Sequence, residues 1–353
     1  MKKMSLILAV AMVVSLLAGC AGTPVVYYTN CTCPTGSHTA PETPAVDVPA
    51  AEGAVKTGLA IIPSIAKSTS ATAEANGKAE YDVTIVAVTV DENGVVYDCV
   101  IDSIGATSEF TAEGVPVKPG TTEVKSKNEL GFDYGMVAYN ASAIGKEWFE
   151  QADALAQFAV GKNIEEVKGS YEDDVDLATS ASIYLGGYVS GIEAAVANAQ
   201  HLGAQAGDEL KLAVTASLDA GAGEEAGGTA QLNLDAAAVT MNGDVITSCT
   251  IDSLQAAVTF DGTGAVGDLS TQPKTKNQLG FDYGMVAYKA SGIGKEWFEQ
   301  AAHFCAYVVG KTPAEVAGIA VDEGTKPTDA DLSTGCTIAV GGFQKLIAKA
   351  AQE

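Results

Sequence analysis

Apolar residues form strand-like runs in two parts of the chain, and helical periodicity follows each set of runs. Asn-Gly pairs at 93–94 and 242–243 interrupt the runs, and both residue types accept the positive φ of a tight hairpin turn. Each set therefore predicts an antiparallel meander of about three strands. The predicted strands are residues 58–66, 79–90 and 95–103 in the first set, and 210–217, 229–241 and 245–253 in the second.

Helical spacing of Trp, Phe, Leu or Tyr follows each meander, at residues 145–160 and 294–309. Thr312 and Pro313 then read as the N-cap and first residue of another helix. We predict an α+β fold class, with two tandem copies of a small domain that combines an antiparallel β-meander with packed helices. The final helices are expected at residues 190–199 and 343–350, each after a Gly-Gly pair.

A block of 27 residues occurs twice. KSKNELGFDYGMVAYNASAIGKEWFEQ begins at Lys125 and KTKNQLGFDYGMVAYKASGIGKEWFEQ at Lys274, with 23 of 27 positions identical at an offset of 149 (274 − 125). That offset is about the size of one ordinary domain and much longer than the unit of a solenoid. We therefore expect a first domain at 58–201, a linker at 202–209 and a second domain at 210–353.

The first 20 residues predict export. Lys2 and Lys3 precede an apolar run at 6–17 that is too short to span a bilayer, and small residues lead to Cys20. The string Leu-Ala-Gly-Cys resembles a bacterial lipobox, which implies cleavage before Cys20 and lipidation of its thiol. The mature chain would then be anchored by its N-terminal lipid on the extracytoplasmic face of the bacterial cell membrane. The alternative to a lipid anchor is a protein that is simply secreted. Residues 21–57 have the composition of a disordered tether.

The charge of the chain argues against nucleic acid as a partner. The net charge is −24, and all 20 cationic side chains are lysine. Phosphate backbones require clustered cations, and specific phosphate or base contacts favour the arginine fork. No metal site is expected either, because Cys31, Cys33 and His38 lack the usual number and spacing of ligands.

A hydroxyl-rich string precedes each final helix. It reads DLSTGCT at 331–337 and DLATSAS at 176–182. This pattern resembles the flavinylation motif of the FMN-binding domain family of bacterial surface lipoproteins. In that family an FAD-dependent flavin transferase joins FMN through its phosphate to the last hydroxyl of the motif. The resemblance implies attachment at Thr337 and Ser182, with Asp331, Thr334, Gly335, Asp176 and Thr179 as further motif residues.

The surroundings of the string are compatible with a phosphate. A helix N-terminus offers free backbone N–H groups, and Gly341 and Gly342 would let the backbone approach a ligand closely. The string departs from the family pattern at three positions: Cys336 replaces Ala, Ser180 replaces Gly, and Ser182 replaces the commoner Thr. The alternative reading is a polar turn whose hydroxyls cap backbone groups.

The repeated block carries an aromatic set in each copy. These residues could contact a flavin ring, although a structural core is the favoured interpretation. Acidic and basic residues beside them are read as turn and helix-start charges, because no nucleophile accompanies them, and no catalytic residue is predicted. The aromatic set is Phe132, Tyr134 and Trp148 in the first copy, and Phe281, Tyr283 and Trp297 in the second.

Two cysteines distinguish the second copy. Cys305 and Cys336 stand where the first copy has Ala156 and Ala181. Paired replacements in one copy predict contact between the long helix and the motif, and an oxidising compartment permits a Cys305–Cys336 disulfide. In the chain-entropy model such a bond would stabilise the protein by about 3 to 4 kcal/mol.

These observations favour an electron carrier with covalent FMN, which receives electrons from a membrane donor, over a stand-alone enzyme. The alternative is a cofactor-free binding or scaffold lipoprotein with the same duplicated fold. A hydrolase is less consistent with the sequence, because His38, His201 and His303 have no counterparts in the other copy.

Overall fold

The computed structural model describes residues 53–223 and 226–352. The expected signal segment, Cys20, most of the tether, and Cys31, Cys33 and His38 lie outside these residues. Within them the protein has two antiparallel sheets and several helices, which confirms the predicted α+β class. We refer to residues 53–201 as the first half and to residues 210–352 as the second half.

The first sheet is the meander predicted for the first set of apolar runs. β1 (Lys56–Ser64), β2 (Gly77–Val90) and β3 (Val96–Phe110) pair in this order, each antiparallel to the next. Gly94 has a φ of 76° in the turn between β2 and β3, which is the conformation that the Asn-Gly pair predicts.

The second sheet has the same order and one additional strand. β5 (Glu209–Ala222), β6 (Gly227–Asn242) and β7 (Val245–Asp261) form its antiparallel meander. β4 (Gly120–Val124) follows β3 in the chain but pairs with β5. A strand of the first half therefore completes the sheet of the second half.

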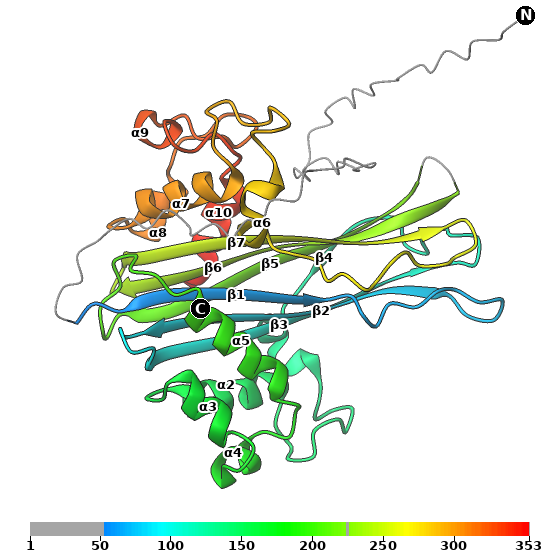
Figure 1. Ribbon diagram of the computed structural model, residues 1–353, viewed down its shortest axis with the longest axis horizontal. Coiled ribbons are helices and arrows are strands. Elements are labelled where there is room, and N and C mark those ends of the chain that lie inside the picture. Colours follow the sequence, from blue (N-terminus) through cyan, green and yellow to red (C-terminus); the bar gives the residue numbers. More distant parts are fainter. Residues whose placement is uncertain (1–52, 224–225, 353) are drawn as a thin grey trace, which may run out of the picture. The chain divides into compact units, whose positions relative to one another are not determined.

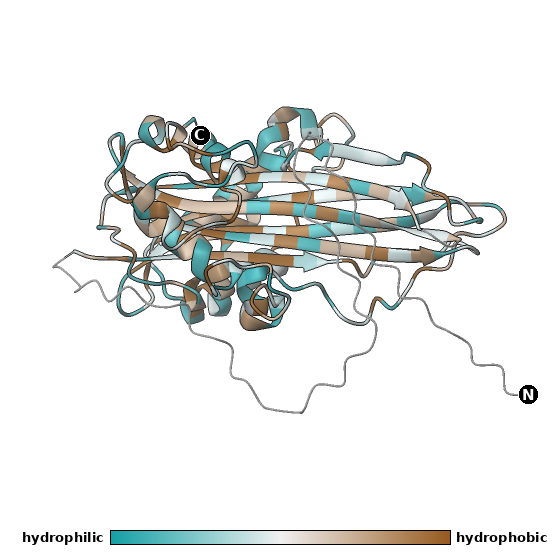
Figure 2. Ribbon diagram, turned by 90° about the horizontal axis from the view of Figure 1, so that it is seen from above, coloured by the Kyte–Doolittle hydropathy of each residue, from teal (hydrophilic) through white to brown (hydrophobic). Residues whose placement is uncertain are grey.

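The two sheets pack face to face around one inner core. Side chains alternate along each strand, so that Tyr81, Val83 and Ile85 of β2 face Leu232 and Leu234 of β6 within the same buried cluster. Bands of apolar and polar residues follow one another along the strands (Figure 2). This alternation is what a sheet with period-2 side chains requires in order to bury one face.

Two contacts connect the halves across the inner core. The Tyr81 hydroxyl donates a hydrogen bond to the backbone oxygen of Ala230 at 2.7 Å. The Phe110 and Phe260 rings stack with a centroid distance of 4.0 Å and an interplanar angle of 3°. The inner core is therefore made jointly by both halves.

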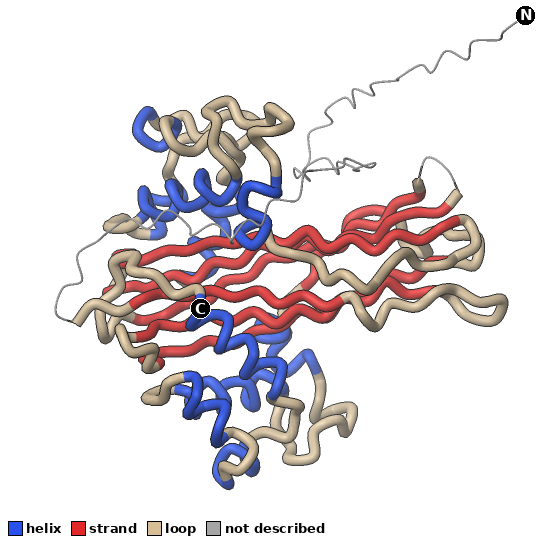
Figure 3. Tube along the Cα trace, in the orientation of Figure 1, coloured by secondary structure: helices blue, strands red, loops and turns tan. Residues whose placement is uncertain are grey.

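Helices cover the outer face of each sheet at one end of the long strands, so these strands are buried on both sides only there (Figure 1; Figure 3). α2 packs over β3, where Trp148 and Leu155 share a buried cluster with Ile101, and α7 covers β7 in the same manner. The helices of the first half are α1 (Lys127–Leu130), the 3₁₀ helix η1 (Gly131–Tyr134), α2 (Trp148–Ala159), α3 (Ile164–Ser170), α4 (Val175–Ser180) and α5 (Gly186–Ala197). Those of the second half are α6 (Lys276–Leu279), the 3₁₀ helix η2 (Gly280–Tyr283), α7 (Trp297–Val308), α8 (Pro313–Ala317), α9 (Ala330–Ser333) and α10 (Gly341–Ala350).

Local sequence sets where α3 and α8 begin. The Thr312 hydroxyl accepts from the backbone N–H of Glu315, and Pro313 is the first helical residue, as predicted. Asn163 caps α3 in the same way, because its side chain accepts from Glu166 N.

No helix among the described residues combines the length and the apolar character needed to cross a bilayer.

Residues 202–209, expected as a linker, run beside the start of β1. Val55 N donates to Ala204 O at 3.0 Å, and Ala206 N donates to Gly53 O at 2.7 Å. Ala204 is buried. The segment between the halves is therefore hydrogen-bonded to the chain that leads into the first sheet.

Candidate functional site

The repeated block builds the same loop in both halves, and a buried carboxylate holds that loop. Glu147, at the start of α2, accepts from Met136 N at 2.8 Å and from Val137 N at 3.0 Å. Glu296, at the start of α7, accepts from Met285 N at 2.7 Å and from Val286 N at 2.9 Å. Both glutamates are almost fully buried. Because charge-assisted hydrogen bonds to backbone are among the stronger ones, these residues fix the loop against the helix.

A buried glutamine one turn further along the helix connects the loop to each motif hydroxyl. In the second half, Gln300 donates to Lys295 O at 2.9 Å, and its Oε1 accepts from the backbone N of Thr337 at 2.8 Å and from the Thr337 hydroxyl at 3.1 Å. The glutamine itself is 0% exposed, whereas Thr337 is half-buried. A fully buried amide therefore sets the position and direction of this hydroxyl.

The first half repeats this arrangement with a different hydroxyl. Gln151 donates to Lys146 O at 2.9 Å, and its Oε1 accepts from Ser182 N at 2.7 Å and from the Ser182 hydroxyl at 3.2 Å. Ser182 is exposed. The structure thus places the two predicted attachment residues at equivalent positions, each bound to an equivalent glutamine. Sequence reasoning did not select these glutamines, although their identity in the two copies of the block was available as a signal.

The other motif residues serve the turn that precedes the attachment residue. The Thr334 hydroxyl donates to the backbone oxygen of Asp331 at 2.7 Å, and the Thr179 hydroxyl donates to that of Asp176 at 2.9 Å. The helix caps are the neighbouring residues Asp174 and Asp329, because their side chains accept from backbone N–H groups of α4 and α9. Asp331, Thr334, Asp176 and Thr179 are all exposed on these short helices.

Gly335 is required by packing against α7. A Cβ at this position would lie 2.3 Å from Cγ of His303, which is far inside contact distance. In the first half the residue at the place of His303 is Ala154, which is why Ser180 is compatible with the same turn. His303 Nε2 is buried and has no hydrogen-bond partner among the residues that the structure describes.

The two glycines at the start of α10 differ in their surroundings. A Cβ on Gly341 would lie 3.0 Å from Cβ of Thr325, so this position is tightly packed. A Cβ on Gly342 would meet only Oδ2 of Asp235, at 3.7 Å, and the residue is exposed. Gly342 alone leaves the backbone open to a ligand.

The expected Cys305–Cys336 disulfide is not present. Cys99, Cys249, Cys305 and Cys336, the cysteines that the structure describes, are all free thiols. Cys305 faces β7, where its Sγ lies 3.4 Å from Sγ of Cys249. The physical reason is the orientation of α7, which directs this side chain onto the sheet.

A lysine lies beside the aromatic set of each half, and it is buried in the second half and half-buried in the first. Lys276 Nζ is 4.9 Å from the centroid of the Trp297 ring and 5.3 Å from that of Tyr283. Burial lowers the pKa of Lys276, and Asp235 and Asp252 oppose this effect. Lys127 makes the equivalent contacts with Trp148 and Tyr134, at 4.9 and 5.1 Å.

Between the outer face of each sheet and its helices lies a buried apolar cluster, which we call the outer core of that half. Trp148 and Trp297 belong to these outer cores, in agreement with the favoured interpretation of the aromatic set. Phe132 and Phe281 are different, because 75% and 63% of each residue is exposed. Each stacks edge-on against a phenylalanine of the following helix. The aromatic residues therefore divide into a buried tryptophan and an exposed phenylalanine in each half.

Asp252 is a buried carboxylate behind this lysine. Its Oδ1 accepts from Asn277 N at 3.0 Å and from Ser253 N at 2.7 Å. Burial raises the pKa of Asp252 from 3.8 to about 6, although the hydrogen bonds and Lys276 act in the opposite direction. Asp102 has the equivalent position in the first half, and burial raises its pKa as well.

Asp252 makes the stability of the protein dependent on pH. Its pKa is higher in the folded state, so folding favours the protonated form, and the free energy of unfolding falls as pH rises from about 4 to 6. We expect the free energy of unfolding of Asp252→Asn, taken relative to that of the wild type, to rise by on the order of 2 to 3 kcal/mol between pH 4 and pH 7. Urea unfolding at each pH measures this difference. Asp244→Asn, at an exposed turn, is the control. A difference between Asp252→Asn and wild type that does not change with pH would contradict this assignment.

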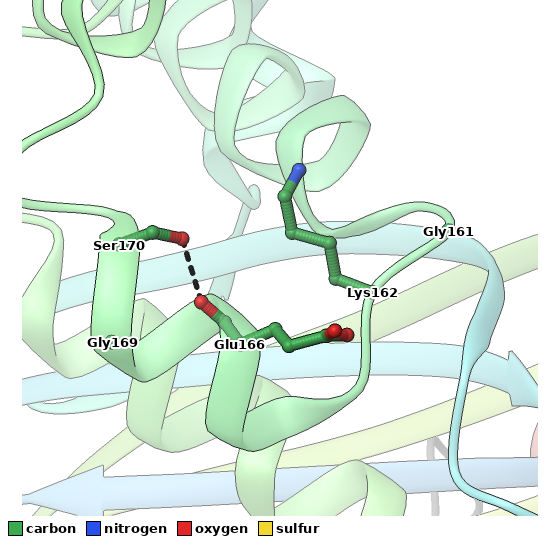
Figure 4. Close-up of a pocket in the computed structure, with 5 residues that line it drawn as sticks. All are labelled: Gly161, Lys162, Glu166, Gly169 and Ser170. Atoms are coloured by element: carbon green, nitrogen blue, oxygen red, sulfur yellow. Dashed lines mark hydrogen bonds between the residues drawn. The ribbon is translucent and has the colours of Figure 1, made fainter.

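A hollow of about 420 Å³ lies elsewhere in the first half, at the two ends of α3 (Figure 4). Gly161, Lys162, Glu166, Gly169 and Ser170 line it. The Ser170 hydroxyl donates to the backbone oxygen of Glu166 at 2.6 Å, and Lys162 Nζ lies 3.9 Å from the Phe158 ring centroid. None of the predicted site residues lines this hollow.

The chain has no match among family models, curated proteins or solved structures.

Proposed function

We propose that this protein is an electron carrier with covalently attached FMN, bound through its phosphate to Thr337 and, in the first half, to Ser182. The supporting observation is the pair of buried glutamines, Gln300 and Gln151. Each holds its hydroxyl in the same way although the two motif strings have diverged. A hydroxyl that must react with an external transferase has to be both fixed and accessible, and half-buried Thr337 and exposed Ser182 meet that condition.

The residues around Thr337 fit a phosphate ester. The ester would replace the hydroxyl proton, while Thr337 N continues to donate to Gln300, so the segment would keep its position. Gly342 leaves one side of the α10 N-terminus open, where free N–H groups favour an anion. When bound, FMN would supply the redox chemistry, and the chain would supply attachment and orientation.

The cellular setting is proposed from the sequence. A lipid on Cys20 would keep the carrier at the extracytoplasmic face of the membrane, where a membrane donor could reduce it. The second half is the stronger candidate for modification, because Thr337 and Gly335 match the motif and Ser182 and Ser180 do not.

Mass spectrometry of the mature chain after co-expression with a flavin transferase tests the proposal. We expect a gain of at least one FMN moiety, with loss of the gain from the second half in Thr337→Ala. Thr328→Ala is the matched control, because this exposed threonine lies outside the 331–337 string and its removal should leave modification intact. If a transferase that modifies a known acceptor adds no mass to this chain, the proposal is incorrect.

An exposed apolar surface favours a second candidate, a cofactor-free binding lipoprotein. Phe132, Val137 and Tyr139 are 75%, 44% and 82% exposed. Their counterparts in the second half are also exposed and are identical in type. Large apolar side chains in water contribute little to folding, so their identity in both copies points to a contact with another molecule. The counterparts are Phe281, Val286 and Tyr288.

Photo-crosslinking in cells tests the binding function. Two variants carry a photoreactive residue, one at position 139 and one at position 288. The binding function predicts the same adduct from both positions and none from position 245, where a similarly exposed valine lies outside the block. Equal labelling at all three positions would remove the support for it.

A further inference from the structure

Two buried thiols meet between the second sheet and the helix that covers it. Cys249 on β7 and Cys305 on α7 are 2% and 5% exposed, and their sulfur atoms are 3.4 Å apart. A disulfide has an S–S distance of about 2.05 Å, so the sulfurs need to approach by only about 1.4 Å. Both side chains belong to the same outer core.

The first half provides a natural comparison. Cys99 holds the strand position of Cys249, but the helix position of Cys305 is occupied there by Ala156. A cysteine on the strand is thus present in both halves, while a sulfur that faces it is present only in the second.

We propose that Cys249 and Cys305 form a disulfide that cross-links β7 to α7 when the chain folds in an oxidising compartment. Each thiol gives up one proton and one electron to a small disulfide oxidant of the glutathione type. The oxidant's S–S bond breaks to yield two thiols, and the bond between the two protein sulfurs forms through a mixed disulfide.

Burial determines when this exchange occurs. The attacking species is a thiolate, and burial, together with the Cys249 thiol, raises the pKa of Cys305 well above its ordinary value. Exchange is therefore slow in the folded protein and faster before α7 covers β7. Once formed, the bond is shielded from reductants and fixes α7, the helix that carries Gln300.

Oxidative refolding tests the proposal. The mature chain is reduced, denatured and refolded in a glutathione redox buffer, then alkylated, digested and analysed by mass spectrometry. We expect a peptide that links Cys249 to Cys305, with Cys99 alkylated in the same sample. The midpoint of thermal unfolding should be about 5 °C higher than after refolding under reducing conditions.

Two variants make the result specific. Cys305→Ala reproduces the Cys99 and Ala156 arrangement of the first half, so it should fold, lose the cross-link and show no redox-dependent shift in melting. Cys336→Ala reproduces Ala181 and should keep the cross-link. Alkylation of both Cys249 and Cys305 in refolded, oxidised protein, or a peptide that links Cys305 to Cys336, would overturn the proposal.

Discussion

A chain divided after Gly207 is expected to give two fragments that do not fold alone and that fold when mixed. Each half contributes one sheet to the inner core, so separation would expose the inner face of both. Fully burying one large apolar side chain is worth about 1.5 to 3 kcal/mol, and the whole stability of a domain is about 5 to 15 kcal/mol. Exposure of Tyr81, Ile85, Leu232 and Leu234 would cost about 6 to 12 kcal/mol in total, which is comparable to that stability, and the rest of the inner core adds to this cost.

Far-UV circular dichroism and thermal melting of each fragment measure this effect. A protease site inserted after Gly207 provides the control, since cleavage of the already folded chain should leave its melting transition in place. Gly207 is exposed and has a φ of 95°, so the insertion disturbs little. A cooperative melt of either fragment alone would show that the halves are independent domains.

Glu296→Ala is expected to destabilise the protein by about 3 to 5 kcal/mol, because two backbone N–H groups lose a buried charged acceptor. Hydrogen exchange should become fast at Met285 and Val286. Urea unfolding gives the change in free energy, and Glu147→Ala should produce a similar loss in the first half.

Glu299→Ala is the matched control for this prediction. Its carboxylate accepts one hydrogen bond, from Glu296 N at 2.8 Å, and it is less buried. We expect a loss of about 1 kcal/mol, as is typical of one helix-capping interaction. A loss in Glu296→Ala no larger than that of the control would mean that the carboxylate does not hold the loop.

The local features of the fold could be predicted because they depend on neighbouring residues. Asn-Gly pairs specify hairpin turns, and Thr312 with Pro313 specifies a helix start, whatever the rest of the chain does. The strands extend further than predicted. β3 continues to Phe110, for example, because its far end is buried by the other sheet and not by a local partner.

Features that depend on distant residues could not be predicted in the same way. β4 has four exposed residues of five and no apolar pattern, so only its pairing with β5 makes it a strand. The sequence identified Cys305 as unusual, but which sulfur it faces depends on how α7 is rotated on β7. Thr337 and Ser182 were selected by their motif, whereas Gln300 and Gln151 emerge only when the helix is placed beside the turn.

The stack of Phe110 on Phe260 has a consequence for how this architecture could arise. Phe110 pairs with Gly77 on β2, and Phe260 pairs with Gly228 on β6, so the two rings occupy equivalent positions in their sheets. Contact between equivalent residues is the mark of a twofold, self-complementary interface, in which each subunit presents the same surface. The inner face of either sheet is therefore the kind of surface through which a single-copy protein would form a homodimer, and a chain with both copies makes that association independent of protein concentration.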